Sequence, residues 1–264
     1  MDYLFPKPEY PAERLPAPAG VEAAFCQCEG DRDEQQDACG LFLAGGGMLA
    51  VVADGMGALA RGGSAAAVAV EATGEEAARL LAAGASYGAV KESLTRVNSQ
   101  VYLMVDNMGV MGMSGTTLCA AAVLGNGARL FWSGDSRAYL WRCGVLTRLT
   151  EDHVYARYLA EMVAEGVITE AEARANPQRT HLTGYLGMRA LEDYSVMAST
   201  VPIQRGDSLL LCTDGLYKCL DEEEMGHCLS RGAYSAAGSL IGLVAKKRLR
   251  YQDNATALVL RWTK

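Results

Sequence analysis

The sequence predicts an α+β fold in which antiparallel sheets pack together with pairs of helices outside them. Short apolar runs are joined by tight turns rich in Gly and Asn, which is typical of antiparallel strands. The helical stretches come in pairs and do not follow every strand, which argues against a doubly wound parallel sheet. Half of the 264 residues are hydrophobic, enough for a sizeable core.

The N-terminal part predicts an extended arm followed by strands. Residues 1–20 are proline-rich, and proline disfavours helices and central strands. Val21–Cys28 is a candidate first strand. Leu41–Leu43 and Met48–Ala53 are short β runs around the turn Gly45-Gly46-Gly47, so they predict a hairpin.

Two helices are expected next. Ser64 is a candidate N-cap, and residues 65–84 after it are rich in helix formers, although Gly74 weakens the middle. A second helix is predicted over Tyr87–Met108. Its apolar side chains recur at helical spacing and predict one core-facing stripe made of Val90, Leu94, Val97, Val101, Met104 and Val105.

The rest of the chain alternates between strands, a polar insert and helices. The predicted strands are Thr116–Leu124, Ala128–Ser133, Arg137–Arg142, Val145–Leu149, Ser208–Thr213 and Ala255–Trp262. Glu151–Pro177 is a polar, mobile surface insert with a short helix (His153–Glu165) and a capping box at Thr169 and Glu172. Two further helices are predicted over Asp221–Ser230 and Tyr234–Arg250.

Composition limits the location and partners of the protein. The net charge is −7 and the sequence pI is about 5.1, so the basic face that nucleic-acid binding needs is not expected. The 8 cysteines are scattered, which favours reduced thiols in a cytoplasmic protein over a disulfide framework or a zinc site. The proline-rich N-terminus does not resemble a signal peptide, and the apolar runs do not predict a membrane anchor.

Acidic residues stand at the edges of several apolar strands. Asp54, Asp214 and Asp253 share this setting, and Asp135 follows a strand in the same way. Carboxylates that meet at one end of a sheet repel each other unless a cation lies among them, and oxygen ligands suit Mg²⁺ or Mn²⁺. An Asp before Gly or Asn is also common in ordinary turns, so spacing alone leaves both interpretations open.

Ordered motifs provide a further signal. They are Arg32-x4-Asp37, Ala53-Asp54-Gly55-Met56-Gly57, Ser114-Gly115-Thr116-Thr117, Gly134-Asp135-Ser136-Arg137-x-Tyr139, Leu149-Thr150-Glu151-Asp152-His153, Leu182-Thr183-x2-Leu186-Gly187, Thr213-Asp214-Gly215-Leu216 and Asp253-Asn254-x-Thr256. In this order the chain resembles the type 2C family of metal-dependent protein serine/threonine phosphatases in its compact bacterial form. The resemblance spans about Cys26 to Trp262.

The resemblance implies a four-layer α-β-β-α sandwich with a two-metal centre at one end. Residues 21–264 would form a single catalytic domain, and a flap at about 151–180 would tune substrate choice. The implied activity is hydrolysis of phosphoserine and phosphothreonine on proteins by a hydroxide that bridges two Mn²⁺ or Mg²⁺ ions. The implied partners are phosphoproteins, substrates of a Ser/Thr kinase, and the implied state is a monomer.

The resemblance also implies roles for individual residues in holding the two core ions. Asp54 would bridge both ions, and the carbonyl of Gly55 would bind one of them. Asp214 and Asp253 would complete the other site. Asp37 would be a close acidic neighbour that ligates directly or through water.

The periphery of the implied site shows departures from the family pattern. Arg32 would bind the substrate phosphate through its planar fork, and Asp135 would help to hold a weaker third ion. Gln36 stands where many members have Glu, and Met56 stands where some have a His proposed as general acid. Lys218 stands where Asp or Asn is common, so it either weakens the third-ion region or points to solvent. Gln36 and Lys218 are the features that favour the alternative of a catalytically weak, phosphatase-like regulatory or binding module.

Overall fold

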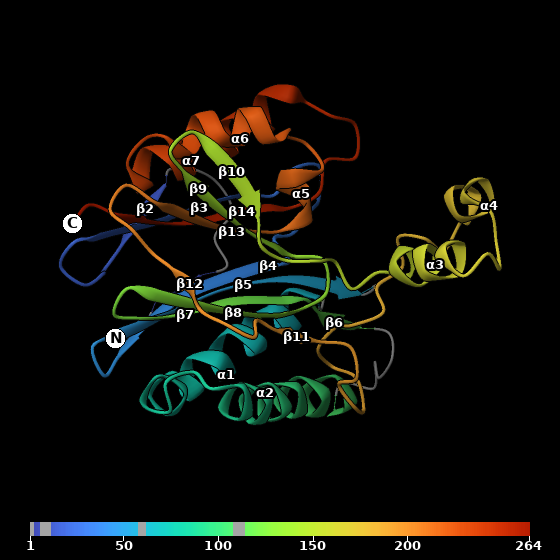
Figure 1. Cartoon of the computed structure of the whole chain (residues 1–264), viewed down its shortest axis with the longest axis horizontal. Coiled ribbons are helices and arrows are strands. Elements are labelled where there is room, and N and C mark those ends of the chain that lie inside the picture. The colour runs from blue at the N-terminus through green and yellow to red at the C-terminus, as the bar shows by residue number, and fades with distance from the viewer. Residues whose placement is uncertain (1–2, 6–11, 58–61, 108–113) are drawn as a thin grey trace.

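The computed structural model describes residues 3–5, 12–57, 62–107 and 114–264. Two β-sheets pack face to face, and helices cover the outer face of each sheet (Figure 1). All strand pairs within the two sheets are antiparallel. The predicted α+β class and its four layers are therefore confirmed.

The first sheet has the order β1-β4-β5-β7-β8-β11, with β6 paired to β5 and β12 paired to β8. Its strands are β1 (Tyr3–Phe5), β4 (Asp37–Ala44), β5 (Gly47–Gly57), β6 (Ser114–Thr116), β7 (Leu118–Leu124), β8 (Gly127–Ser133), β11 (Ser195–Val196) and β12 (Val201–Pro202). The β4–β5 hairpin confirms the predicted turn, and β4 begins earlier than predicted, at Asp37. This extension brings an acidic residue into the sheet.

The second sheet has the order β10-β9-β13-β14-β3-β2. Its strands are β2 (Glu13–Leu15), β3 (Val21–Cys28), β9 (Arg137–Arg142), β10 (Val145–Arg148), β13 (Ser208–Cys212) and β14 (Ala255–Trp262). The described parts of the proline-rich segment 1–20 thus provide one short edge strand to each sheet, β1 and β2. Edge positions tolerate nearby proline because one side of the strand needs no ladder partner.

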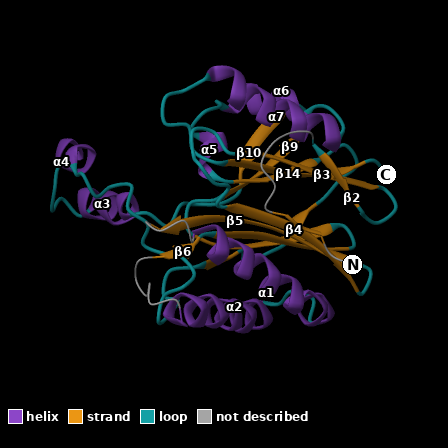
Figure 2. Cartoon of the chain, turned by 180° about the vertical axis from the view of Figure 1, so that it is seen from behind, coloured by secondary structure: helices purple, strands orange, loops and turns teal. Residues whose placement is uncertain are grey.

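Helices α1 (Gly62–Ala82) and α2 (Tyr87–Asn107) cover the first sheet, as Figure 2 shows from behind. The prediction of Ser64 as N-cap is wrong, because α1 already includes Gly62 and Ser64 lies inside it. Of the predicted α2 stripe, the side chains Val90, Leu94, Val97 and Val101 are buried and Met104 packs beside them. The side chain of Val105 and residue Met108 lie outside the described part of the chain.

Gly74, in the middle of α1, packs directly against the ring of Phe42. A Cβ placed on it would lie 2.2 Å from the ring of Phe42 in β4. The absence of a side chain therefore lets the helix approach the sheet closely, which offsets the lower helix propensity of glycine.

The second sheet is covered by α6 (Glu222–Leu229) and α7 (Ala233–Lys247), next to the short helix α5 (Asp214–Tyr217). The sequence did not predict α5. Its four residues follow the buried strand β13 after Thr213, and their Asp-Gly pair suggests an ordinary turn. Three buried apolar clusters fill the space between the layers, one between the sheets and one under each helical layer.

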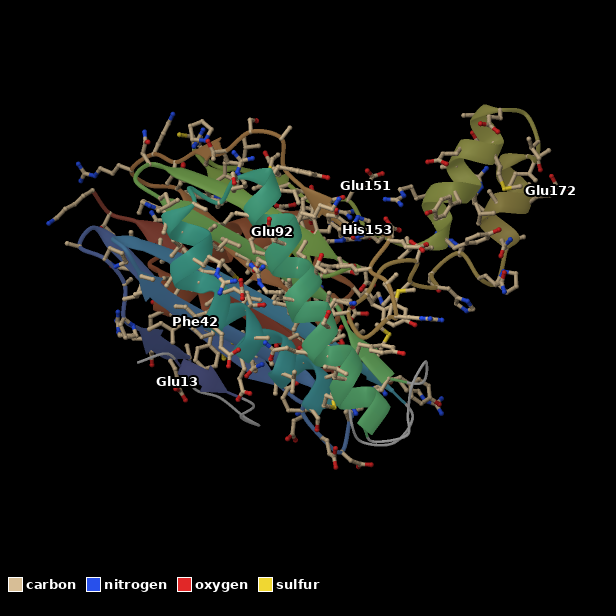
Figure 3. All side chains as sticks on the ribbon, turned by 90° about the horizontal axis from the view of Figure 1, so that it is seen from below. Glu13, Phe42, Glu92, Glu151, His153 and Glu172 are labelled. Carbon is tan, nitrogen blue, oxygen red and sulfur yellow. The ribbon has the colours of Figure 1, made fainter. Side chains whose placement is uncertain are left out.

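Helices α3 (Tyr155–Ala164) and α4 (Glu170–Ala175) project away from the sandwich (Figure 1). The predicted capping box of Thr169 and Glu172 is present at the start of α4. Figure 3 shows Glu172 in the projection, whereas Glu151 and His153 lie where the projection joins the body. Among the described helices, none combines the length and apolar character needed to cross a membrane.

Candidate active site

Five carboxylates predicted from the sequence lie at one end of the sandwich. Asp37 and Asp54 face each other as cross-strand partners in β4 and β5. Asp214 lies two residues after the end of β13, and Asp253 precedes β14, with which β13 pairs. Asp135 lies in the turn between β8 and β9. The sheet topology therefore brings together residues that are up to 216 positions apart in the sequence.

Asp37 is buried at the base of the site, with 1% of its surface exposed. Its Oδ2 accepts hydrogen bonds from the hydroxyls of Thr213 and Thr256, both at 2.7 Å. Its Oδ1 is buried and has no hydrogen-bond partner among the described residues. Burial raises the pKa of Asp37 to about 7, the two hydroxyls oppose this shift, and the neighbouring carboxylates of Asp214 and Asp253 add to it.

Asp54 is fixed through its main chain. Its N–H donates to Thr117 Oγ1 at 2.9 Å, and its carbonyl accepts from the Thr116 hydroxyl and the Thr117 N–H, both at 2.9 Å. Burial raises the pKa of the Asp54 carboxyl well above its ordinary value, and repulsion from Asp37 and the other site carboxylates raises it further. The Ser-Gly-Thr-Thr motif therefore holds the strand that carries Asp54.

Asp214 and Asp253 each have a cationic partner. The ammonium of Lys218 forms a short ion pair with Asp214 Oδ2. Arg32 Nη2 lies 2.8 Å from Asp253 Oδ2, and 57% of the Arg32 side chain is exposed. The second oxygen of Asp214, Oδ1, is buried, and the part of the chain that the structure describes offers it no hydrogen-bond partner.

Lys218 therefore points toward the carboxylates, although 59% of its side chain remains exposed. The sequence left this orientation open. Asp135 lies on the same side of the site, where Tyr217 donates its hydroxyl to the Asp135 carbonyl at 3.0 Å. Burial and the charge of Asp214 raise the pKa of Asp135 to about 6, whereas the charge of Lys218 lowers it.

A cavity of about 270 Å³ opens onto these residues. Its walls are formed by Arg32, Gln36, Asp54, Gly55, Met56, Gly57, Thr117, Asp135, Thr180, Leu182, Asp214, Lys218 and Asp253. Asp37 lies beneath this cavity and does not line it. Thr180 and Leu182 belong to the segment that returns from α4, so the projecting insert reaches the site through its base. His181, between them, is exposed.

The arrangement fits divalent cations. Asp37 and Asp214 each have a buried oxygen without a described partner, and the carboxyl pKa values of Asp37 and Asp54 are raised. A cluster of anions shows these features when no cation neutralises it. An all-oxygen donor set suits Mg²⁺ or Mn²⁺. Within the described residues, no three acidic, His or Cys side chains are already placed to share one ion. Lys218 and Arg32 hold two of the carboxylates, so a cation at Asp214 or Asp253 would compete with these ion pairs.

Several supporting residues had weak or no signals in the sequence. Asn254 Oδ1 accepts from the Gln36 N–H at 2.8 Å, and its amide donates to the carbonyls of Glu29 and Glu34. The motifs contain Asn254, but its contacts depend on loops 220 and more residues away. Gln27 donates to Thr256 Oγ1 at 2.9 Å and had no signal, because a single Gln in a strand predicts nothing specific.

His153 is a buried structural residue, in agreement with its interpretation from the sequence. Its ring stacks on Trp132 with centroids 6.0 Å apart. Its Nδ1 accepts the Gly134 N–H at 3.2 Å, and its Nε2 lies 2.9 Å from the Ser195 hydroxyl. Burial lowers the pKa of His153, so the ring is neutral near neutral pH and supports the turn that carries Asp135.

Comparisons with known proteins agree with this geometry. Residues 27–239 match the profile of the protein phosphatase 2C family. The chain is 31% identical to the serine/threonine phosphatase stp of Listeria monocytogenes over 216 residues, which cover 80% of this chain and 83% of that protein.

Solved structures show the same fold. The PPM Ser-Thr phosphatase MsPP of Mycobacterium smegmatis, in complex with cacodylate, superposes with a TM-score of 0.71 at 32% identity, covering 91% of this chain and 97% of that one. The catalytic domain of PstP with 2 manganese ions superposes with a TM-score of 0.69 at 27% identity, covering 92% and 99%. The chain belongs to the protein phosphatase 2C family of serine/threonine phosphatases.

Proposed function

We propose that the chain hydrolyses phosphoserine and phosphothreonine on proteins with the help of two divalent cations, Mn²⁺ or Mg²⁺. The observation that carries the proposal is the convergence of four carboxylates on one cavity with Asp37 beneath it, where two buried carboxylate oxygens have no hydrogen-bond partner among the described residues. Relatives at this level of identity include a structure that contains two manganese ions.

The proposed ligands of the core cations are Asp54, the carbonyl of Gly55, Asp214 and Asp253, with Asp37 beneath them. Bound there, the cations would neutralise phosphate charge and acidify a water for attack on phosphorus. The hydroxyls of Thr213 and Thr256 would hold the Asp37 carboxylate in place, and the Ser-Gly-Thr-Thr strand would hold Asp54.

Arg32 is the proposed phosphate ligand. Its guanidinium lies on the cavity wall and is largely exposed, so it can turn from Asp253 to an incoming phosphate. The guanidinium offers parallel N–H donors that match two phosphate oxygens. Phosphoryl transfer depends mainly on positioning and charge neutralisation, so a protein nucleophile is not required.

A third, weaker cation site would lie near Asp135, where Lys218 competes with it. Residues 21–264 are proposed to act as one catalytic domain, and the projection at 151–180 to select among phosphoprotein substrates of a Ser/Thr kinase. A monomeric, cytoplasmic protein is the proposed state. Exchanging residues 155–175 for another sequence without any change in phosphopeptide ranking would argue against this role of the projection.

A second candidate is a binding module with little turnover. The ion pair between Lys218 and Asp214 favours this candidate, because the ammonium binds a carboxylate that would otherwise be available to a divalent cation. Hydrolysis of p-nitrophenyl phosphate and of a phosphothreonine peptide in millimolar Mn²⁺, with Asp54→Asn as control, distinguishes the two. Absence of metal-dependent hydrolysis in the wild-type protein would favour the binding module.

A further inference from the structure

Three loops of the active site meet at Gln252, which is half-buried. Its N–H lies 3.3 Å from Asp31 Oδ2, and its carbonyl accepts the Asp31 N–H at 2.8 Å. Its side-chain amide donates to the Gly215 carbonyl at 2.9 Å and to the Asp253 carbonyl at 3.0 Å. One residue is therefore bonded to segments from both ends of the chain and from the start of α5.

The loop around Gln252 has an unusual backbone conformation. Arg248 and Tyr251 have φ values of 46° and 62°, in the left-handed region that residues with a side chain rarely adopt. The Tyr251 side chain is 78% exposed, so packing of its ring does not explain this conformation. The Tyr251 N–H donates to Asp31 Oδ2 at 2.8 Å, and this hydrogen bond holds the turn.

The loops also touch through their backbones. A Cβ on Gly30 would lie 2.5 Å from the carbonyl oxygens of Gln252 and Asp253. A Cβ on Gly215 would lie 2.1 Å from the carbonyl oxygen of Asn254. The spacing between these loops is thus set by direct contact, with no room for a side chain between them.

Each residue that makes these bonds is next to a residue of the proposed site. Asp31 precedes Arg32, Gln252 precedes Asp253, and Gly215 follows Asp214. A movement of any one loop is therefore transmitted to a side chain that contacts phosphate or cation, and small displacements of such groups lower binding.

We propose that Asp31 and Gln252 are positioning residues that fix the relative placement of Arg32, Asp214 and Asp253. Neither contacts the substrate, and both act through their neighbours in the chain. The inference rests on the proposed function, because it assigns Asp31 and Gln252 to the cation and phosphate site proposed above.

Gln252→Glu is the sharpest test of the side-chain bonds. The carboxylate has the same shape, but it cannot donate a hydrogen bond and would face two carbonyl oxygens. The dissociation constant for Mn²⁺ is expected to rise about tenfold or more, as is KM for p-nitrophenyl phosphate. Should this variant not fold, Gln252→Ala removes the donors without adding a charge.

Asp31→Ala and Asp31→Asn separate the hydrogen bonds from the charge. Alanine removes the acceptor for the N–H groups of Tyr251 and Gln252, and Mn²⁺ affinity is expected to fall about three- to tenfold. Asparagine keeps one acceptor oxygen and is expected to stay within about twofold of wild type. Asp33→Ala, a loss of the same charge at an exposed position two residues away, is the matched control.

The measurements are Mn²⁺ titration calorimetry on metal-free protein, steady-state kinetics, thermal unfolding, and amide hydrogen exchange at Tyr251 and Gln252. Exchange at these two amides should be faster in Asp31→Ala and unchanged in Asp33→Ala. If the two residues only stabilise the fold, the variants will have a lower unfolding temperature but wild-type Mn²⁺ affinity and wild-type exchange at these two amides. That result would overturn the inference.

The outcomes separate the two proposals. Wild-type Mn²⁺ affinity and KM in both Gln252→Glu and Asp31→Ala overturn the inference alone and leave the proposed function in place. A wild-type protein that neither binds Mn²⁺ nor hydrolyses phosphate esters overturns the proposed function and the inference with it.

Discussion

The carboxylate cluster has two sides, a strand-built wall with Asp37 and Asp54 and a loop-built wall with Asp214 and Asp253, and they are built differently. Asp37 and Asp54 belong to paired strands and are held by Thr hydroxyls and main-chain bonds. Asp214 and Asp253 belong to a short helix and a loop, and each pairs with a cationic side chain. The strand-built wall keeps its carboxylates close together in spite of their repulsion. The loop-built wall carries counter-ions that a divalent cation must displace, so it is expected to set the metal affinity.

Asp54→Asn should give the largest effect on the strand-built wall. It removes a charge from the centre of the proposed metal site, and metal-dependent turnover should fall about a thousandfold or more. The metal-free protein should become more stable, because a buried carboxylate that repels its neighbours is removed. Steady-state kinetics and urea unfolding in EDTA test both parts. An equally active variant would show that Asp54 is not needed to hold the cations.

The pH dependence of stability should report Asp37 on the strand-built wall and Asp135 in the turn between β8 and β9. The pKa of Asp37 is raised to about 7 and that of Asp135 to about 6, above the unfolded value of 3.8. A raised pKa means that the folded state binds more protons, so the stabilisation is complete below about pH 4 and is lost as the pH rises through 6 to 7.

Metal-free protein should therefore lose stability between pH 5 and pH 8, by an amount on the order of a few kcal/mol. Saturating Mn²⁺ should remove this loss, because the cation replaces the protons. Urea unfolding at both pH values, with EDTA or with Mn²⁺, measures the difference. Greater stability of the metal-free protein at pH 8 would contradict the mutual repulsion inferred for this wall.

Lys218→Met tests whether the Lys218 ammonium competes with a cation for Asp214 on the loop-built wall. Without the competing ammonium, Mn²⁺ affinity should rise about tenfold, and metal-free stability should fall by no more than about 1 kcal/mol because the Lys218 side chain is largely exposed. Lys218→Asp should change the Mn²⁺ dependence of the rate further, since it adds a ligand. Lys246→Met, at an exposed position on α7, is the control. An unchanged calorimetric titration would show that Lys218 does not compete.

The smallest expected effect lies outside both walls. Replacing residues 156–176 with a short Gly-Ser linker removes most of the projection but keeps Thr180 and Leu182 on the cavity. Turnover of p-nitrophenyl phosphate should change by no more than about threefold, because neither wall is touched. The ranking of phosphopeptides should change. A large loss with the small substrate would show that the projection also supports the cavity.

The sequence predicted several strands of the sandwich better than the loops and the short helix between them. Strands such as Arg137–Arg142 and Ala255–Trp262 follow from local apolar runs and turns, and their bounds are confirmed. All five predicted Asp residues and Arg32 lie together in the structure. Their roles as ligands remain proposals.

What the sequence could not predict depends on contacts distant along the chain. The orientation of Lys218 follows from α5, a four-residue helix with no periodic pattern. The bonds from Gln252 to Asp31 and from Asn254 to Glu29 connect residues more than 200 positions apart, and local propensity contains no such information. The start of α1 at Gly62 was missed because Ser64 is a good N-cap by type, although the structure places it inside the helix.

Strand β14 has a consequence for biosynthesis. It lies between β13 and β3 in the second sheet, so residues 255–262 separate residues 208–212 from residues 21–28. A nascent chain whose residues 253–262 are still within the ribosome can form the first sheet, but it lacks Asp253 and cannot close the second. Catalytic competence should therefore appear only after residues 253–262 have left the ribosome and joined the second sheet.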